Sequence, residues 1–286
     1  MQTDLFGKKR FKVNLHTHTT LSDGRKTPQE AIEFYRERGY DALAFTDHWH
    51  FGEGYDANGL TVLSGGEYHV QGNDTLKGVF HIVGIGMRRQ PSTTLSDSAQ
   101  KIIDEIHAAG GLAVLAHPAW SLNTLDQILP LQNVDLTEIY NGISGVHNNR
   151  RPDSSLIVDM LATRGRLYPL LAVDDAHYYD TDAGIAWIMV EAEDNQPQSL
   201  LSAIKAQRFY ATQGPEVHLT REDDAFVVNC SPCQEIVFFT NLVSPRAFVG
   251  DGITTARYTL KSGERFIRAA VMDRNGKYAW SNIIEV

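Results

Sequence analysis

The chain has 286 residues, 42% of them hydrophobic and 21% charged, which is the composition of an ordinary globular protein and excludes a disordered chain. Its formal net charge of -9 argues against a nucleic-acid polymer or an anionic membrane as partner. No apolar run is long enough to cross a bilayer, and residues 1–10 lack the apolar core of a signal peptide, so a cytoplasmic protein is the default expectation.

The first predicted strand, residues 11–15, leads directly into a pair of histidines. Side chains alternate along extended chain, so His16 and His18 point to the same side and can reach one metal ion. Asp23 follows on a Ser-Asp-Gly turn, where it can serve a second ion nearby. A single His-x-His pair is weak evidence for a metal site, but the ends of later predicted strands repeat the pattern.

Helical and apolar patterns alternate over the next part of the chain. A helix is predicted from residue 28, because Thr27 is a suitable N-cap, Pro28 suits the first helical position and Glu30 completes a capping box. The predicted strands are residues 42–45, 60–63, 78–86, 112–116, 134–139, 167–173 and 185–190, and the later helices are residues 96–109, 154–163 and 197–207. Near-continuous apolar strands between helices indicate a mostly parallel sheet, in either a β/α barrel or a doubly wound fold.

The pattern changes near residue 212, where the helical periodicity ends. Short alternating runs follow at residues 226–228, 235–240, 256–260 and 266–272, and residues 273–276 are typical of a hairpin turn. We therefore predict two domains, an α/β domain over residues 1–211 and a small antiparallel β-sandwich over residues 212–286. Cys230 and Cys233, the only cysteines, are interpreted as a structural pair of thiols.

Metal-binding side chains recur at, or just past, the ends of separate predicted strands. They are His16, His18, Asp23, His48, Glu67, His81, His117, Asp175 and His177. Each histidine taken singly is more commonly structural, but a structural explanation must then account for several independent coincidences. In β/α barrels the carboxyl ends of the strands carry the active site. Imidazole and carboxylate ligands suit zinc, manganese or iron.

The same residues carry a resemblance to the PHP (polymerase and histidinol phosphatase) family of metal-dependent hydrolases. The matching motifs are His16-x-His18, Ser22-Asp23-Gly24, Thr46-Asp47-His48, Glu67, His81 before Gly84, Ala116-His117-Pro118 and Asp175-x-His177. The resemblance implies a distorted seven-stranded, TIM-like β/α barrel and mostly phosphoesterase activity. It also implies two or three divalent ions (Mn, Zn or Fe) as cofactors.

The resemblance further implies how the ligands are shared. His16, His18, Glu67 and Asp175 would hold the first ion, Glu67 would bridge to a second held by His81 and His117, and Asp23, His48 and His177 would hold a third. Many family members have histidine in place of Asp23, although aspartate also occurs in the small phosphoesterase branch. The C-terminal segment more loosely resembles the tail of carbaryl-hydrolase-like members, which leaves carboxyl and carbamate esters open as substrates.

The favoured function is hydrolysis of phosphate esters of a small metabolite or nucleotide, by a hydroxide between two ions. Glu67 and His177 are the predicted catalytic residues, Glu67 as the bridge and His177, or a nearby solvent molecule in its place, as the proton donor. Asn141, Arg150 and Arg151 are candidate substrate contacts. The alternatives are a carboxyl ester or carbamate hydrolase, a nuclease, and a non-catalytic binding module. The expected partner is a small phosphorylated substrate, and no oligomeric state is predicted.

Overall fold

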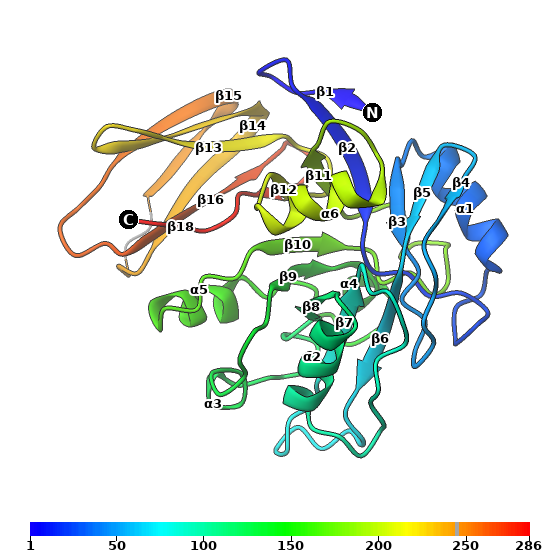
Figure 1. The fold of residues 1–286 in the computed structure, drawn as a ribbon. Helices are drawn as coiled ribbons and strands as arrows, with labels where there is room; N and C mark the ends of the chain where they lie inside the picture. Colours follow the sequence, from blue (N-terminus) through cyan, green and yellow to red (C-terminus); the bar gives the residue numbers. More distant parts are fainter. Residues whose placement is uncertain (244–245) are drawn as a thin grey trace.

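The computed structural model describes residues 1–243 and 246–286 and places them in two β-sheets with short helices outside them (Figure 1). The smaller sheet has five strands in the order β10-β9-β8-β7-β6. Its strands are β6 (Gly65–His69), β7 (His81–Ile85), β8 (Leu112–Leu115), β9 (Leu136–Asn141) and β10 (Leu170–Val173). β8, β9 and β10 are parallel, whereas β7 is antiparallel to both of its neighbours. The beginning of β7 therefore lies at the same edge as the end of β8.

The larger sheet has thirteen strands, ten of them in the order β13-β14-β16-β17-β12-β11-β2-β3-β5-β4. Its N-terminal strands are β1 (Gln2–Thr3), β2 (Lys9–Asn14), β3 (Ala42–Ala44), β4 (Tyr55–Ala57) and β5 (Leu60–Leu63). The others are β11 (Trp187–Glu191), β12 (Phe209–Thr212), β13 (Val217–Glu222), β14 (Ala225–Thr240), β15 (Arg246–Thr259), β16 (Phe266–Met272), β17 (Tyr278–Trp280) and β18 (Ile284–Glu285). β2, β3 and β5 run parallel.

The described helices are α1 (Pro28–Glu37), α2 (Ala99–Ala108), α3 (Leu125–Ile128), α4 (Gly142–Val146), α5 (Ser155–Thr163) and α6 (Pro197–Lys205). The predicted start of α1 is confirmed, because the Thr27 hydroxyl accepts from the backbone N–H of Glu30 and the Glu30 carboxylate accepts from that of Thr27. α2 is capped by Ser98, so the predicted start of this helix at residue 96 was two residues early.

The two sheets share one apolar core. Val13 of β2 and Ile188 of β11 belong to the same buried cluster as Val83, Val114 and Leu170 of the smaller sheet. Each fully buried side chain of this kind stabilises the folded state by about 1.5–3 kcal/mol. This shared core holds the strand ends of both sheets in fixed relative positions.

The predicted TIM-like barrel of seven strands is not found as a closed sheet among the described residues. β11 lies antiparallel between β2 and β12, where it cannot complete a parallel ring with β10. Within residues 1–243 and 246–286, no ladder joins β10 to β2; the segments that follow these two strands meet at an isolated bridge between Thr17 and Ala176. The sheets are mixed and open, so the expectation of a mostly parallel sheet was also wrong. The predicted α/β class is confirmed in its general form, as a mixed α/β protein with large sheets and short helices.

The C-terminal residues form antiparallel strands, and the predicted hairpin at residues 273–276 is confirmed by the pairing of β16 with β17. These strands continue the larger sheet, because β12 pairs with β17 through Ala211 and Trp280. A separate second sheet is not found in residues 217–243 and 246–286, so the sandwich is not confirmed. The boundary between residues 211 and 212 stays a prediction. No helix in the described part of the chain is long and apolar enough to span a membrane.

Candidate metal centre

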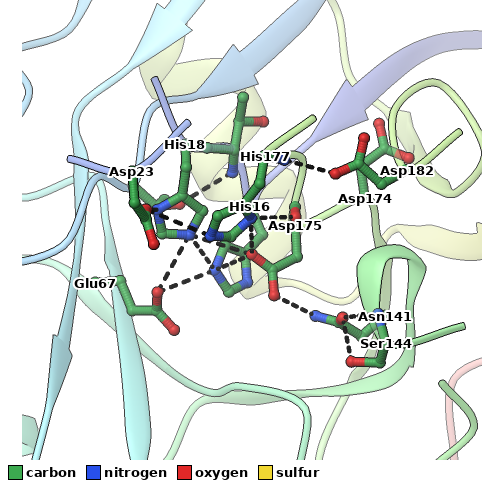
Figure 2. Close-up of polar contacts among 12 residues, drawn as sticks. His16, His18, Asp23, Glu67, Asn141, Ser144, Asp174, Asp175, His177 and Asp182 are labelled. Atoms are coloured by element: carbon green, nitrogen blue, oxygen red, sulfur yellow. Dashed lines mark hydrogen bonds and ion pairs between the residues drawn. The ribbon is translucent and has the colours of Figure 1, made fainter. Parts of the chain in front are cut away.

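Histidines and carboxylates from both sheets meet at one edge of the shared core (Figure 2). β2 ends just before His16, β8 ends just before His117 and β10 ends just before Asp175. His81 opens β7 and reaches the same edge, because β7 runs antiparallel to β8. The first and last motifs are joined directly, since the backbone N–H of Asp175 donates to the carbonyl of His16 and that of His18 donates to the carbonyl of Ala176.

Four side chains surround one point. Nε2 of His16 lies 3.2 Å from Nε2 of His18. Oε2 of Glu67 lies 3.4 Å from Nε2 of His16 and 3.2 Å from Nε2 of His18. Oδ1 of Asp175 lies 3.3 and 3.1 Å from the same two nitrogens. Ligand atoms about 2.0–2.1 Å from a tetrahedral zinc ion lie roughly 3.3 Å apart, so these separations fit a shared divalent ion.

The two oxygens of Glu67 face different histidines. Oε1 lies 2.9 Å from Nδ1 of His81 and 3.4 Å from Nε2 of His117. Oε2 faces His16 and His18, and it also lies 3.0 Å from Nδ1 of His48. Glu67 is only 1% exposed. Its carboxylate is therefore the group that connects the two sets of imidazoles.

A third group surrounds Asp23, which is half exposed at the mouth. Its carboxylate lies 3.4 Å from Nε2 of His177, 3.7 Å from Nε2 of His48 and 3.5 Å from Nδ1 of His18. His48 and His18 each present one nitrogen to Asp23 and the other to Glu67. The separations here are longer than those around His16, so this group is the more open of the three.

The histidine rings are held by bonds to their other nitrogens. Nδ1 of His16 lies 2.6 Å from Oε1 of Glu138. Nδ1 of His117 lies 3.2 Å from the Ser121 hydroxyl, and Nδ1 of His177 lies 2.8 Å from the carbonyl of Asp175. A hydrogen bond at Nδ1 directs the lone pair of Nε2 into the site, which is how metal-binding histidines are usually oriented.

Glu138 is the site residue that the sequence analysis missed. It lies in β9, is 1% exposed, and its second oxygen accepts from the backbone N–H of His117 and from the Asn141 amide. The available signal was the alternation in the predicted strand 134–139, which puts Glu138 on the same face as Val134 and Leu136, because a charge buried in a strand needs partners.

Burial and the two central carboxylates set the electrostatics of the site. Burial alone lowers the pKa of His16, but Asp175, Glu138 and Glu67 raise it well above its ordinary range. Burial likewise opposes protonation of His18, while Asp175 and Glu67 raise the pKa of His18 to about 9. Burial raises the pKa of Glu67, yet the surrounding histidines hold it well below its usual value. The site is therefore built around carboxylates that stay negative.

Two buried atoms in this cluster have no hydrogen-bond partner among the described residues. They are Oδ1 of Asp175 and Nδ1 of His48. A buried acceptor without a partner is costly, and both atoms lie beside other electron-pair donors. A cation between these donors would satisfy them, so the side chains fit a divalent metal.

A scan against protein-family models matches residues 14–122 to the PHP domain. This family match covers the N-terminal part of the chain. The matched residues include seven of the nine candidate ligands, from His16 to His117, whereas Asp175 and His177 lie beyond them. A search of curated proteins found no match.

Similar solved structures include a two-domain protein from Bacteroides vulgatus ATCC 8482, described as containing a predicted PHP-like metal-dependent phosphoesterase. The two sequences are 14% identical, the alignment covers 100% of this chain and 97% of the Bacteroides chain, and the TM-score is 0.54. An amidohydrolase from Chromobacterium violaceum, solved with sulfate and no metal, is 18% identical. The alignment covers 69% of this chain and 96% of the amidohydrolase chain, with a TM-score of 0.42. The first likeness supports the fold of the chain over its whole length, including the C-terminal strands.

The predicted substrate contacts have different surroundings. Asn141 is 1% exposed and donates to Oδ2 of Asp175 at 3.0 Å (Figure 2) and to Oε2 of Glu138 at 2.9 Å, so it orients two carboxylates of the candidate metal centre. Arg150 donates to the carbonyl of Gly145. Arg150 and Arg151 are exposed and line a separate cavity of about 450 Å³, which none of the nine candidate ligands lines. A role for the two arginines in substrate binding stays a prediction.

Two of the candidate ligands lie on loops with uncommon backbone conformations. Asp175 has φ 53° and His117 has φ 28°, both in the left-handed region that residues with side chains rarely adopt. The loop after Asp175 is anchored by Asp182, which accepts from the backbone N–H groups of His177, Tyr178 and Tyr179. Backbone strain of this kind persists where surrounding contacts fix the chain.

Proposed function

We propose that this protein is a metal-dependent hydrolase that cleaves phosphate esters of a small metabolite or nucleotide. The observation that supports this most strongly is the set of separations around Nε2 of His16 and His18, all between 3.1 and 3.4 Å. Nitrogen and oxygen donors at such spacing suit Mn, Zn or Fe. The charge of the site also suits an anionic substrate only when cations are present.

In this proposal the nine candidate ligands divide into three sets. His16, His18, Glu67 and Asp175 would hold one ion. His81 and His117 would hold a second ion, and Glu67 would contribute its other oxygen to that site. Asp23, His48 and His177 are proposed for a third. When bound, paired divalent ions supply a nucleophile from water near neutral pH and polarise the phosphorus centre.

The chain's own residues then have separate tasks. Glu67 keeps both sets of imidazoles at a fixed spacing through its two oxygens. Asn141 holds Oδ2 of Asp175, which leaves Oδ1 for the ion. His177 has Nδ1 bonded to the Asp175 carbonyl, and its Nε2 is placed to ligate the third ion or to donate a proton to the leaving oxygen.

Chelation and metal add-back test the proposal. The protein is stripped with a chelator and assayed on p-nitrophenyl phosphate before and after Mn, Zn or Fe is restored. We expect activity to vanish on stripping and to return with at least one of the three ions, together with two or three ions per chain by elemental analysis. Phosphatase activity that survives complete removal of metal would refute the proposal.

The same preparation separates the alternative substrates. Bis-p-nitrophenyl phosphate reports diester cleavage, and p-nitrophenyl acetate and a p-nitrophenyl carbamate report the other hydrolases. We expect the phosphate monoester to be cleaved fastest. Faster metal-dependent cleavage of the acetate or the carbamate would assign the protein to the ester or carbamate hydrolases instead.

A further inference from the structure

A second cavity, of about 520 Å³, lies where the N-terminal strands meet the C-terminal part of the larger sheet. Its walls come from the turn between β1 and β2, from the start of β12, from β13 and from residues 281–284. The N-terminal turn contacts the segment before β13 directly, since the backbone N–H of Leu5 donates to the carboxylate of Glu216. Figure 1 shows β1 and β2 beside the C-terminal part of the larger sheet. None of the nine candidate metal ligands lines this cavity.

One part of the wall is apolar. Phe209 and Val217 are buried there, and Leu219, Ile283 and Ile284 complete the surface. Water in contact with such a surface is readily displaced by an apolar group of matching size, at a gain of about 25 cal/mol per Å² removed from water. The volume suits a small organic molecule, because ligand pockets commonly measure about 300–1,000 Å³.

The other part of the wall is cationic, in contrast to the acidic chain. Lys8, Arg10 and Arg208 line the cavity with one carboxylate, Glu191. Glu191 is paired with Lys8 at 2.7 Å and with Arg10 at 3.2 Å. Arg208 is exposed, and the only hydrogen bond of its side chain in the described residues is a long one of 3.5 Å from Nε to the Glu191 carbonyl.

Arg10 is the central polar group. Its side chain is only 8% exposed, and Nε donates to Asp4 at 2.8 Å while Nη2 faces Glu191. For Nη1 of Arg10 no acceptor is found in the described part of the chain. The guanidinium also lies 5.6 Å from the centre of the Tyr210 ring. A buried guanidinium held on one side and free on the other is prepared to receive an anion.

We propose that this cavity binds a small organic anion with an apolar body, such as an aromatic or acyl carboxylate, sulfonate or phosphate. Nη1 of Arg10 and the Arg208 guanidinium receive the anionic group, and the body lies against Phe209 and Leu219. Asp4 fixes the Arg10 guanidinium from the side of the N-terminal turn without lining the cavity. This binding site does not depend on the proposed hydrolase activity.

The test uses two fluorescent probes with the same ring system. Anilinonaphthalene sulfonate carries the anionic group, and phenylnaphthylamine lacks it. The manganese-loaded protein is titrated with each. We expect one saturable site for the sulfonate, at least about tenfold tighter than for the neutral probe, as a charge-assisted hydrogen bond requires. Equal affinity for the two probes, or no saturable binding of the sulfonate, would overturn the proposal.

Variants locate the site. Arg208→Gln should weaken sulfonate binding several-fold, and Leu219→Asp should abolish it, because each alters the cavity wall at a side chain that is not fully buried. Arg257→Gln is the matched control, since this exposed arginine lies on β15 and pairs with Glu222. Sulfonate binding that is unchanged in both cavity variants would place the probe elsewhere and refute the site.

Discussion

Glu67 is the single residue on which most of the candidate metal centre depends. Five imidazoles each have a nitrogen between 2.9 and 3.4 Å from one of its oxygens, and the carboxylate is buried. Burying an isolated carboxylate would be costly, so these neighbours and any bound cation must compensate its charge. A change that keeps the size of this side chain and removes its charge isolates that contribution.

We predict that Glu67→Gln loses most of the bound metal and lowers phosphatase activity by at least about a hundredfold, because an amide has one weak acceptor in place of two charged ligand oxygens. Elemental analysis and initial rates on p-nitrophenyl phosphate measure both effects. Glu53→Gln, at an exposed position, should retain metal and activity. Full metal content in Glu67→Gln would contradict the proposed bridge.

Glu138 acts through His16 rather than on substrate. Its Oε1 lies 2.6 Å from Nδ1 of His16, so we predict that Glu138→Gln weakens metal binding by about 10–100-fold, the usual cost of losing a carboxylate behind a ligand histidine. Competition with a chromogenic chelator measures the affinity, and circular dichroism reports whether the fold is kept. Glu33→Gln on the exposed face of α1 is the control. A folded Glu138→Gln variant with unchanged metal affinity would rule out this positioning role.

At the scale of elements, the turn after His18 brings Asp23 back toward the histidines. Gly24 donates its backbone N–H to the Thr19 carbonyl and is buried. A Cβ at this glycine would lie 2.4 Å from the carbonyl carbon and oxygen of His18. The Ser-Asp-Gly motif therefore needs glycine because the chain passes so close to the backbone of His18.

Gly24→Ala is predicted to destabilise the fold by about 1–3 kcal/mol, the typical cost of forcing extra volume into a packed site. The substitution should also weaken manganese binding at the site formed by Asp23, His48 and His177, since the turn has to move away from His18. Urea denaturation and manganese titration measure the two effects. Gly52→Ala is the control, because a Cβ there meets its nearest atom at an ordinary 3.6 Å. Equal stability of the two variants would contradict the steric argument.

At the scale of the whole molecule, one buried ion pair joins the C-terminal strands to the helical side. Arg268 of β16 donates from Nε and Nη2 to the two oxygens of Asp159 of α5, each at 2.7 Å, and the arginine side chain is 0% exposed. A two-point bond of this kind fixes orientation as well as distance. The C-terminal strands are therefore attached by this pair as well as by the pairing of β12 with β17.

We predict that Arg268→Ala lowers the free energy of unfolding by about 3 kcal/mol, because it leaves a cavity and an unpaired carboxylate. Chemical denaturation followed by circular dichroism measures the change. Arg257→Ala, which breaks the exposed pair with Glu222, should change it by about 0–1 kcal/mol. An Arg268→Ala variant as stable as the Arg257→Ala variant would show that the pair does not hold the C-terminal strands.

Local signals in the sequence predicted the local structure well. The capping box at Thr27 and the hairpin at residues 273–276 depend on neighbouring residues alone, and both are confirmed. The recurrence of histidines and carboxylates after apolar runs indicated one edge of a sheet, and the structure brings these side chains together there. The predicted closure of the sheet is not found among the described residues, and apolar runs could not have indicated it, because they do not distinguish parallel from antiparallel neighbours.

The sequence by itself determined which residues offer metal-binding groups and that they follow successive strands, since strand periodicity and turn chemistry are local properties. Only the tertiary structure decided which atoms meet. Glu138 reaches His16 from β9, and His48 divides its two nitrogens between Glu67 and Asp23. Those contacts depend on how two sheets pack over one core. The packing of segments far apart in the sequence produces no periodic pattern of residues from which it could be predicted.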